Sequence, residues 1–429
     1  MKVFKNVMIF DYERFYENGY IVFGDEILEV GNMEDYEEKD GEVYDLRGKL
    51  AMPGFINSHM HMYSAFARGM IVPFNPKSFS DILKQLWWKL DSKLDEEAVY
   101  YSGLVSALEM LRSGTTVVID HHASGMVVKG SLDALSKAVS DEVGMRGVYC
   151  FETSDRFDVK EAIEENLRFM EKRDEKKAGM FGLHASLSLS DSTLKKVSEV
   201  LDGRPIHVHV AESLEDEQDS LRKSGVRVVE RLDGFGLLTE GSVLAHCVHI
   251  DDREADILKD RGVYVAFNVT SNMNNAVGLP RYDIFRDRGV KVVIGNDGLG
   301  FNITRDYLNF FFSQKLVLGN ITSVGLEDLF GAIKNGYELA SKLLGVKLGG
   351  IEPGYKADLV VLDYDPYTPV TEENVGGHVV FGIFDFPKVV HVLVDGEFLV
   401  KDGDVLFDEE GVYREARRVA EKVWERLRG

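Results

Sequence analysis

PGFINSHMHMYSAF (residues 53–66) places two histidines at the end of a short apolar segment. Such a segment is typical of a buried strand, and in a strand residues i and i+2 lie on the same face. His59 and His61 can therefore point at one object. Two interpretations are open for the pair alone: it binds a metal ion, for which imidazole is a common ligand, or it is two polar residues in a loop.

Seven further apolar segments follow along the chain, and amphipathic stretches with helical periodicity separate them. They are TTVVID (115–120), RGVYCFE (146–152), AGMFGLHAS (178–186), PIHVHVAE (205–212), SVLAHC (242–247), VYVAFN (263–268) and KVVIGND (291–297). Buried strands that alternate with helices in this number are typical of a (β/α)₈ barrel. The fold class is therefore predicted to be α/β, with a TIM barrel as the main domain.

Both ends of the chain have a different pattern, typical of antiparallel sheet. Residues 1–52 contain short β-prone segments separated by turns, and residues 351–406 do the same. Neither flank has enough apolar residues to bury a core alone. We therefore expect both chain ends to form one small β-sandwich domain beside a barrel of residues 53–350. Residues 407–429 are predicted to form a charged C-terminal helix.

Polar residues stand where the predicted strands end. In a TIM barrel the C-terminal ends of the strands meet at one mouth, where catalytic groups lie. Seven of the eleven histidines close a predicted strand: His59, His61, His121, His122, His184, His209 and His246. Histidines scattered through a core would not cluster in this way, so the cluster favours a metal site at the mouth.

Four motifs in this order, PGFINSHMH, HVHVAE, AHC and GNDG, resemble the metal-dependent amidohydrolase superfamily over nearly the whole chain. The segment IEPGYKADLVVLD is similar to the one with which that family returns to its split β domain. HASLSLSD (184–191) and SNMNNAVG (271–278) resemble its branch of cyclic-amidine deaminases and chlorohydrolases, and DHHASG with LWWKLD is most similar to the aminohydrolases called SsnA. One departure is NVTSNM (268–273), where relatives often carry a proline after the asparagine.

The resemblance implies His59, His61, His209 and Asp297 as the metal ligands. Three imidazoles and one carboxylate suit Zn²⁺, with Fe²⁺ as the alternative, and leave a coordination position for water. His207 shares a strand face with His209, but His209 lies nearer the strand end, as the family motif requires. We therefore assign His207 to the barrel interior.

The resemblance also implies the number of metal ions. Relatives with two ions commonly carry a bridging carbamylated lysine at the end of the fourth strand. This chain has His184 at that place. One divalent metal ion is therefore expected.

The implied catalytic residues are Glu212, His246 and Asp297. Asp297, beside the metal, would accept the proton of the attacking water and orient its oxygen. Glu212 would carry that proton to the leaving nitrogen as a general acid and base; the alternative is that it only orients His209. His246 would polarise the substrate or stabilise a developing oxyanion.

Substrate contacts are expected from five residues: His184, His121, Arg68, Trp88 and Asp91. His184 would hydrogen-bond the substrate ring, or be a structural histidine. Only one of the neighbours His121 and His122 can face the mouth, and His121 is preferred. Trp88 and Asp91 lie in the long segment after the first strand, where a lid would be, although tryptophans often only pack. Arg68 would bind an anionic or carbonyl group unless it is a surface arginine.

These observations predict a hydrolase that acts on carbon–nitrogen bonds other than peptide bonds. We expect it to deaminate a nitrogen heterocycle of the purine, pterin, pyrimidine or triazine type. The first alternative is ring-opening hydrolysis of a cyclic amide, which would use the same groups. The second is a non-catalytic barrel that binds a ligand, but the presence of both Glu212 and Asp297 disfavours it.

Composition limits the partners and the location. Lys and Arg number 50 against 72 Asp and Glu, and the net charge of −22 disfavours nucleic acid and anionic membranes as partners. Cys150 and Cys247 lie in apolar segments, which is typical of a reducing compartment. We expect no signal peptide and no membrane span. The sequence therefore predicts a cytoplasmic enzyme of a small heterocycle, and the resemblance allows a homo-oligomer.

Overall fold

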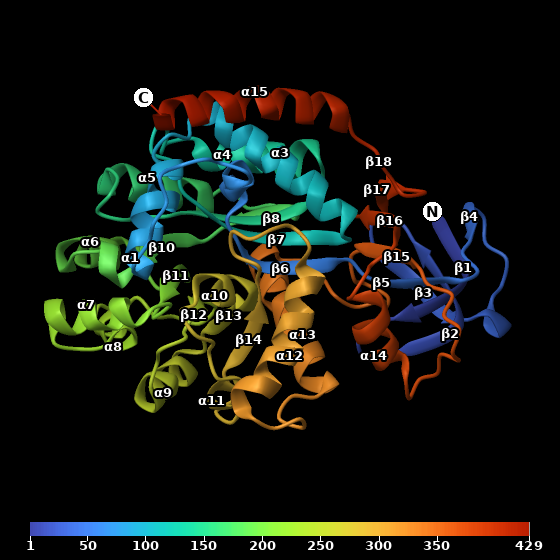
Figure 1. Ribbon diagram of the computed structural model, residues 1–429. Helices are drawn as coiled ribbons and strands as arrows, with labels where there is room; N and C mark the ends of the chain where they lie inside the picture. The colour runs from blue at the N-terminus through green and yellow to red at the C-terminus, as the bar shows by residue number, and fades with distance from the viewer. Residues whose placement is uncertain (429) are drawn as a thin grey trace.

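A computed structural model describes residues 1–428 of the chain. One sheet, at the right of Figure 1, contains strands from both chain ends. Its strands are β1 (Lys2–Phe10), β2 (Phe15–Phe23), β3 (Ile27–Asn32), β4 (Glu42–Asp45), β5 (Lys49–Pro53), β15 (Leu359–Asp363), β16 (Val389–Val394), β17 (Glu397–Lys401) and β18 (Asp404–Val405). Their order is β18-β17-β16-β15-β5-β1-β2-β3, with β4 paired to β1. The antiparallel pair of β15 and β5 joins the two flanks.

This sheet folds over onto itself. Phe4 of β1 and Phe398 of β17 are four strands apart, which would separate them by about 19 Å in a flat sheet. Their ring centroids lie only 6.3 Å apart, and Tyr44 of β4 lies 5.2 Å from Phe398. A separate hydrophobic cluster that includes Ile21 and Leu359 fills the folded sheet.

The larger body of the molecule contains parallel strands, which alternate with helices along the chain (Figure 1). One sheet contains β6 (Phe55–Met60), β7 (Thr115–His122), β8 (Arg146–Phe151) and β9 (Lys177–Gly179). The other contains β10 (Phe181–Ala185), β11 (Ile206–Val210), β12 (Val243–His246), β13 (Tyr264–Phe267) and β14 (Lys291–Ile294). Parallel bridges join the two sheets at both edges, between Thr153 and Leu183 and between Met60 and Asp297, so that the strands close into a ring. The predicted α/β class is confirmed.

Helices connect these strands and cover the ring. They are α3 (Glu96–Arg112), α4 (Ser131–Ser136) with the π-helical turn η4 (Lys137–Glu142), α5 (Val159–Met170), α6 (Asp191–Leu201), α7 (Leu214–Ser224), α8 (Val228–Gly234), α9 (Asp252–Arg261), α10 (Val269–Asn275), α11 (Tyr282–Arg286), α12 (Ile303–Leu318) and α13 (Leu326–Leu344). Short helical turns are η1 (Met33–Asp35), η2 (Met62–Ala67) and η5 (Ser186–Ser188). After β6 the chain makes a helical excursion through α1 (Phe79–Ile82), η3 (Leu83–Trp87) and α2 (Trp88–Asp91).

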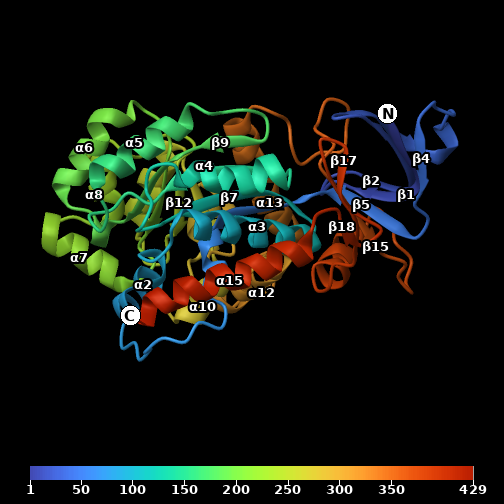
Figure 2. The ribbon, with the colours of Figure 1, turned by 90° about the horizontal axis from the view of Figure 1, so that it is seen from above.

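The last helix of the chain, α15 (Glu409–Arg428), packs along α3 on the outside of the ring (Figures 1 and 2). Its buried residues are Val412, Ala416, Val419 and Val423, whose spacing forms one apolar stripe. Trp424 Nε1 donates a hydrogen bond of 2.8 Å to the carbonyl of Phe66, two positions before Arg68. The C-terminus therefore supports the segment that follows β6.

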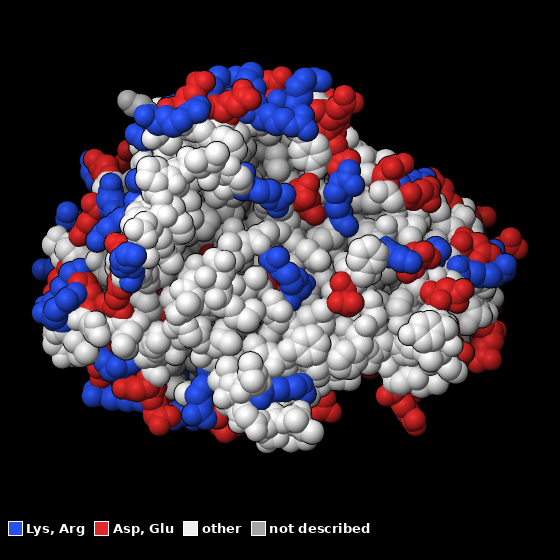
Figure 3. All heavy atoms as spheres, in the orientation of Figure 1, with Lys and Arg blue, Asp and Glu red and all other residues white. Residues whose placement is uncertain are grey.

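The two bodies meet at a buried arginine. Arg146, at the start of β8, pairs through Nε with Asp358 at 2.6 Å and also contacts Asp395 in the turn between β16 and β17. A short helix, α14 (Val375–His378), continued by η6 (Val379–Ile383), completes the C-terminal part. Basic and acidic side chains are interspersed on the face shown in Figure 3. Within residues 1–428, every helix is too short or too polar to cross a lipid bilayer.

Candidate active site

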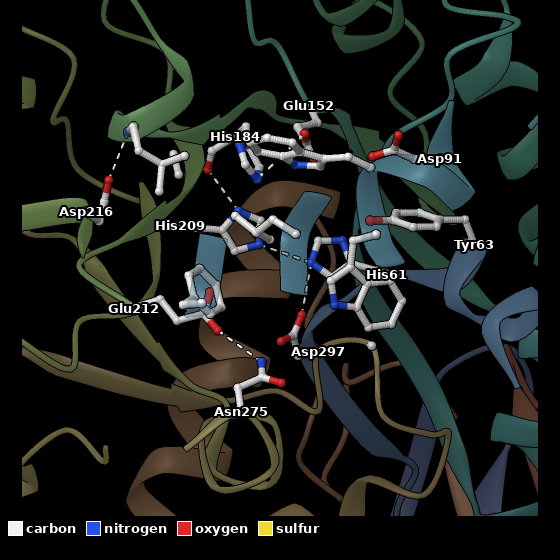
Figure 4. A pocket seen from close by; sticks show the side chains of 17 residues that line it. His61, Tyr63, Asp91, Glu152, His184, His209, Glu212, Asp216, Asn275 and Asp297 are labelled. Atoms are coloured by element: carbon white, nitrogen blue, oxygen red, sulfur yellow. Dashed lines mark hydrogen bonds and ion pairs between the residues drawn. The ribbon is translucent and has the colours of Figure 1, made fainter. Parts of the chain in front are cut away.

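Four side chains from three strand ends converge at the mouth of the ring: His59, His61, His209 and Asp297. His61 Nε2 lies 3.0 Å from Asp297 Oδ1 and 3.1 Å from His209 Nε2 (Figure 4). His59 Nε2 lies 3.6 Å from the same Asp297 oxygen. The i, i+2 spacing in β6 does bring the first two imidazoles together, as expected from strand geometry.

Hydrogen bonds on the outer side of the rings show which nitrogen faces this cluster. His61 Nδ1 lies 2.6 Å from the carbonyl oxygen of His121, and His209 Nδ1 lies 2.8 Å from that of His184. A carbonyl oxygen only accepts, so both Nδ1 atoms carry a proton and both neutral rings present an Nε2 lone pair to the cluster. Two lone pairs and a carboxylate oxygen at these distances repel one another unless a positive charge lies among them.

That positive charge can be a proton or a metal ion. Burial lowers the pKa of His61, but its hydrogen bond and attraction to Asp297 raise it to about 9. Imidazole nitrogens and a carboxylate oxygen are also the ligands that zinc prefers, and a metal ion displaces such protons when it binds. The donor set therefore fits a divalent metal ion.

His59 is oriented by a second histidine. His59 Nδ1 lies 2.8 Å from His207 Nε2, and within residues 1–428 the buried Nε2 of His59 has no hydrogen-bond partner. When His207 accepts the proton of His59 Nδ1, the free Nε2 of His59 faces the cluster. A hydrogen bond of this kind fixes the tautomer and the ring orientation of a metal-binding histidine. Sequence reasoning placed His207 in the interior but missed this contact, because the two residues are 148 positions apart.

Two carboxyl groups of the site have pKa values shifted in opposite directions. Burial would raise the pKa of Asp297, but its contacts with His59 and His61 hold it well below its usual value. Burial and the negative charge of Asp297 raise the pKa of Glu212 well above its usual value. Environments that separate the pKa values of neighbouring carboxyl groups are typical of acid–base catalysis.

His246 lies between these two carboxyl groups. Its Nε2 is 3.5 Å from Glu212 Oε2 and 4.0 Å from Asp297 Oδ2. Burial lowers the pKa of His246 to about 3, so the ring is neutral near pH 7. Asn272 Nδ2 lies 3.0 Å from His246 Nδ1. When this amide donates, His246 carries its proton on Nε2 and can donate it toward Glu212 and Asp297.

Helix α10 contacts each of the three polar groups just described. Ser271 Oγ lies 2.5 Å from Asp297 Oδ2, Asn272 Nδ2 lies 3.0 Å from His246 Nδ1, and Asn275 Nδ2 lies 3.4 Å from Glu212 Oε1. The proline that relatives often carry would stand at Val269, the first residue of this helix. The N–H at that position has no partner inside the helix, so the helix can begin there with or without proline.

The backbone is strained at the same rim. Ala211, His246 and Asp297 adopt the left-handed conformation, with φ of 47°, 76° and 56°. Such conformations cost about 1–3 kcal/mol each and persist where the surrounding structure enforces them. At Asp297 the backbone N–H donates to the carbonyl of His59 at 3.1 Å, which ties the end of β14 to β6.

A cavity opens beside the cluster (Figure 4). Of the expected substrate contacts, His184, Trp88 and Asp91 line it. Glu152 lines it as well, and its Oε1 lies 3.8 Å from His184 Nε2. The sequence marked Glu152 as a strand-end residue but assigned it no role.

Two expected substrate contacts lie elsewhere. Arg68 stacks over the ring of Phe301 at 5.0 Å and faces a neighbouring hollow. His121 is fully buried behind the cavity, where its Nε2 donates to the carbonyl of Leu183 at 2.9 Å. His122 does not line the cavity either, and its Nε2 lies 3.0 Å from Ser124 Oγ.

Comparisons with known proteins agree with this geometry. The family described as Amidohydrolase family matches residues 50–399. The chain is 32% identical over 421 residues to the 5'-deoxyadenosine deaminase of Methanocaldococcus jannaschii, covering 94% of this chain and 95% of the relative. It is 30% identical to the 5-methylthioadenosine/S-adenosylhomocysteine deaminase 2 of Archaeoglobus fulgidus, with 97% and 98% covered. A crystal structure of an adenosine deaminase from Xanthomonas campestris with bound zinc has the same fold, with a TM-score of 0.85 at 20% identity over 98% of both chains.

Proposed function

Because the chain belongs to the amidohydrolase family, we propose that it is a zinc-dependent deaminase of adenosine-type nucleosides. It is an aminohydrolase that acts on carbon–nitrogen bonds of a nitrogen heterocycle. In the proposed reaction, water adds to the ring carbon that bears the amino group, the carbon–nitrogen bond breaks, and ammonia leaves. The observation that carries the proposal is the pair of carboxyl groups, Glu212 and Asp297, with opposite pKa shifts beside a cluster of imidazole nitrogens.

The proposed metal site holds one divalent ion, zinc rather than iron, on His59, His61, His209 and Asp297. The bare Nε2 atoms described above and the buried, unpartnered Nε2 of His59 support this assignment. When bound, such an ion lowers the pKa of water from about 15.7 to about 7 and supplies a nucleophile near neutral pH.

The chain's own groups would move the protons. Ionised Asp297 accepts a proton from the attacking water. Glu212, whose raised pKa favours its protonated form, donates its proton to the substrate ring, receives the proton of the hydroxyl group that has added to the ring carbon, and passes it to the leaving nitrogen; the proton that Asp297 accepted from water then restores Glu212. Neutral His246 donates a hydrogen bond from Nε2 to the oxygen that develops negative charge. His184 and Trp88, in the cavity wall, would contact the ring.

The same proposal includes the domain organisation. The ring of parallel strands forms a (β/α)₈ barrel over residues 53–350, and residues 1–52 and 351–406 form a β-sandwich domain. The folded-over sheet that contains strands from both flanks supports this division. Residues 407–428 form a C-terminal helix that belongs to the barrel, which the packing of α15 against α3 supports, and the predicted end of this helix at residue 429 lies outside the described residues.

The test is a comparison of substrates with zinc-loaded protein. Adenosine, 5'-deoxyadenosine, guanine, cytosine and an aminotriazine are offered at equal concentration, and ammonia release is followed together with ring absorbance. We expect the purine nucleosides to be deaminated fastest, and a chelator to remove the activity until zinc is restored. Release of ammonia from a pyrimidine or triazine but from neither nucleoside would contradict the proposed substrate class.

A further inference from the structure

One wall of the cavity contains two buried acidic side chains, on the side away from Glu212 and Asn275 (Figure 4). Asp91 is the last residue of α2, and Glu152 follows β8. Their side chains are only 1% and 3% exposed, yet both line the cavity. They therefore lie across the cavity from Glu212, the proposed proton donor.

The nearest guanidinium is already occupied by these two acids. Arg156 Nη2 lies 2.5 Å and 2.6 Å from the two oxygens of Asp91, and Nη1 lies 2.9 Å from Glu152 Oε1. The guanidinium also stacks over Trp88 at 4.7 Å and over Phe157 at 4.8 Å. Arg156 thus lies behind the wall with its terminal nitrogens and its planar face engaged, and it does not itself line the cavity.

The cavity consequently offers oxygens but no cation to this end of a substrate. Of the residues that the structure describes, no lysine or arginine lines the cavity, whereas several acids do. A carboxylate or phosphate that entered would lose its water without gaining a positive partner, which is strongly unfavourable. Like charge placed against Asp91 would add to this cost. A hydroxyl, a methyl or an ammonium group meets no such obstacle.

This inference rests on the proposed function. We propose that Asp91 and Glu152, held in place by Arg156, select substrates by the charge of their 5' substituent. They admit nucleosides whose sugar carries a neutral or cationic 5' substituent, and they exclude those with an anionic one. Asp91 and Glu152 act on the remote end of the substrate and take no part in proton transfer. This selection would distinguish between nucleosides that carry the same reacting ring and differ only in the 5' substituent.

A matched series of adenosine derivatives tests this. The zinc-loaded protein is assayed with 5'-deoxyadenosine (neutral), 5'-amino-5'-deoxyadenosine (cationic), and adenosine 5'-carboxylic acid and adenosine 5'-phosphate (both anionic). We expect kcat/KM for the anionic members to be at least about 100-fold lower than for the neutral one. The cationic member should be turned over at least as well as the neutral one.

Variants connect the effect to the wall. Asp91→Asn and, separately, Glu152→Gln each remove a carboxyl group that engages Arg156 and so free part of its guanidinium, and the neutral-to-anionic ratio of kcat/KM should fall at least about tenfold. Asp133→Asn is the control, because Asp133 pairs with Arg168 and Lys172 outside the cavity and its loss changes the net charge equally. The control should keep the wild-type ratio.

The outcomes are distinguishable. Turnover of adenosine 5'-phosphate within tenfold of 5'-deoxyadenosine by the wild-type protein would overturn the charge proposal and leave the deaminase intact. An unchanged ratio in a folded, zinc-loaded Asp91→Asn or Glu152→Gln protein would do the same. If neither variant folds, the wild-type series still decides. No ammonia from any member would overturn the proposed nucleoside deaminase itself, and this inference with it.

Discussion

Asp297 and Glu212 share one cavity, yet their surroundings separate them. Asp297 lies among imidazoles and accepts from Ser271, whereas Glu212 is buried beside the negative charge of Asp297. The sequence could predict that both residues belong to the site, because a strand-end position and a motif are local features. It could not predict how His207 contacts His59, since that contact depends on how distant strands are placed in the ring.

Glu212→Gln and Asp297→Asn should fail in different ways. Glu212→Gln is expected to keep the metal and lower kcat by about 10²–10⁴-fold, the usual contribution of a general acid–base group. Asp297→Asn should lose both metal and turnover, because it removes the only carboxylate of the proposed ligand set. Metal content and kcat are measured on both variants side by side. Near-normal turnover of Glu212→Gln would reduce Glu212 to a group that orients His209.

Asp306 of α12 predicts a pH dependence of stability. It is buried, accepts from the backbone N–H of Thr270 at 3.3 Å, and burial raises its pKa to about 7. The folded protein thus holds a proton that the unfolded chain releases above about pH 4. The contribution of protonated Asp306 to the free energy of unfolding is complete below that pH and is lost as the pH rises through about 7. Asp306→Asn should therefore show a smaller fall in Tm between pH 5 and pH 8 than the wild type.

Glu327→Gln is the matched control for this experiment, since Glu327 is exposed on the neighbouring helix α13. Its change in Tm between pH 5 and pH 8 should equal that of the wild type. An Asp306→Asn protein whose Tm follows the wild-type pH profile would show that Asp306 is not protonated in the folded state.

At the scale of elements, strand ends could be predicted and supporting helices could not. Alternation of apolar segments and polar endings located β6, β11, β12 and β14 from the sequence, because each strand is determined by its own residues. The segment AGMFGLHAS was expected as one strand and is two, β9 and β10, with Met180 between them. Helix α10 was noted only as a family motif, and its contacts with the site depend on packing that local periodicity does not specify.

Ser271→Ala tests the support that α10 gives. Its hydroxyl donates to Asp297 Oδ2 at 2.5 Å, so its loss should weaken metal affinity by about 10–100-fold. Asn274→Ala on the same helix is the control, because Asn274 is exposed and its side-chain hydrogen bond goes to Asn275 rather than to the cluster. Zinc affinity is measured by competition with a chelator of known strength. Equal affinities in the two variants would show that Ser271 does not orient Asp297.

At the scale of the whole molecule, chain ends far apart in sequence share one sheet. The apolar content of each flank was enough to predict that neither could fold alone. The order of the strands and the pairing of β15 with β5 could not be predicted, because many pairings bury the same residues equally well. The contact between the sheet and the ring could not be predicted either, since Arg146 appears in the sequence as an ordinary residue at a strand start.

Arg146 should hold the two bodies together. It is fully buried and pairs with Asp358 and Asp395, so Arg146→Met leaves two carboxylates without their guanidinium. Removing one partner of a buried ion pair costs about 3–5 kcal/mol, whereas a surface pair contributes about 0–1 kcal/mol.

Arg112→Met, which breaks the half-exposed pair with Glu409, is the matched control. Thermal unfolding should show a large drop in Tm for Arg146→Met and little change for the control. Because unpaired carboxylates cause the loss, a second substitution, Asp358→Asn, should restore part of the Tm in the Arg146→Met protein. A Tm equal to that of the control would mean that apolar contacts alone join the sheet to the ring.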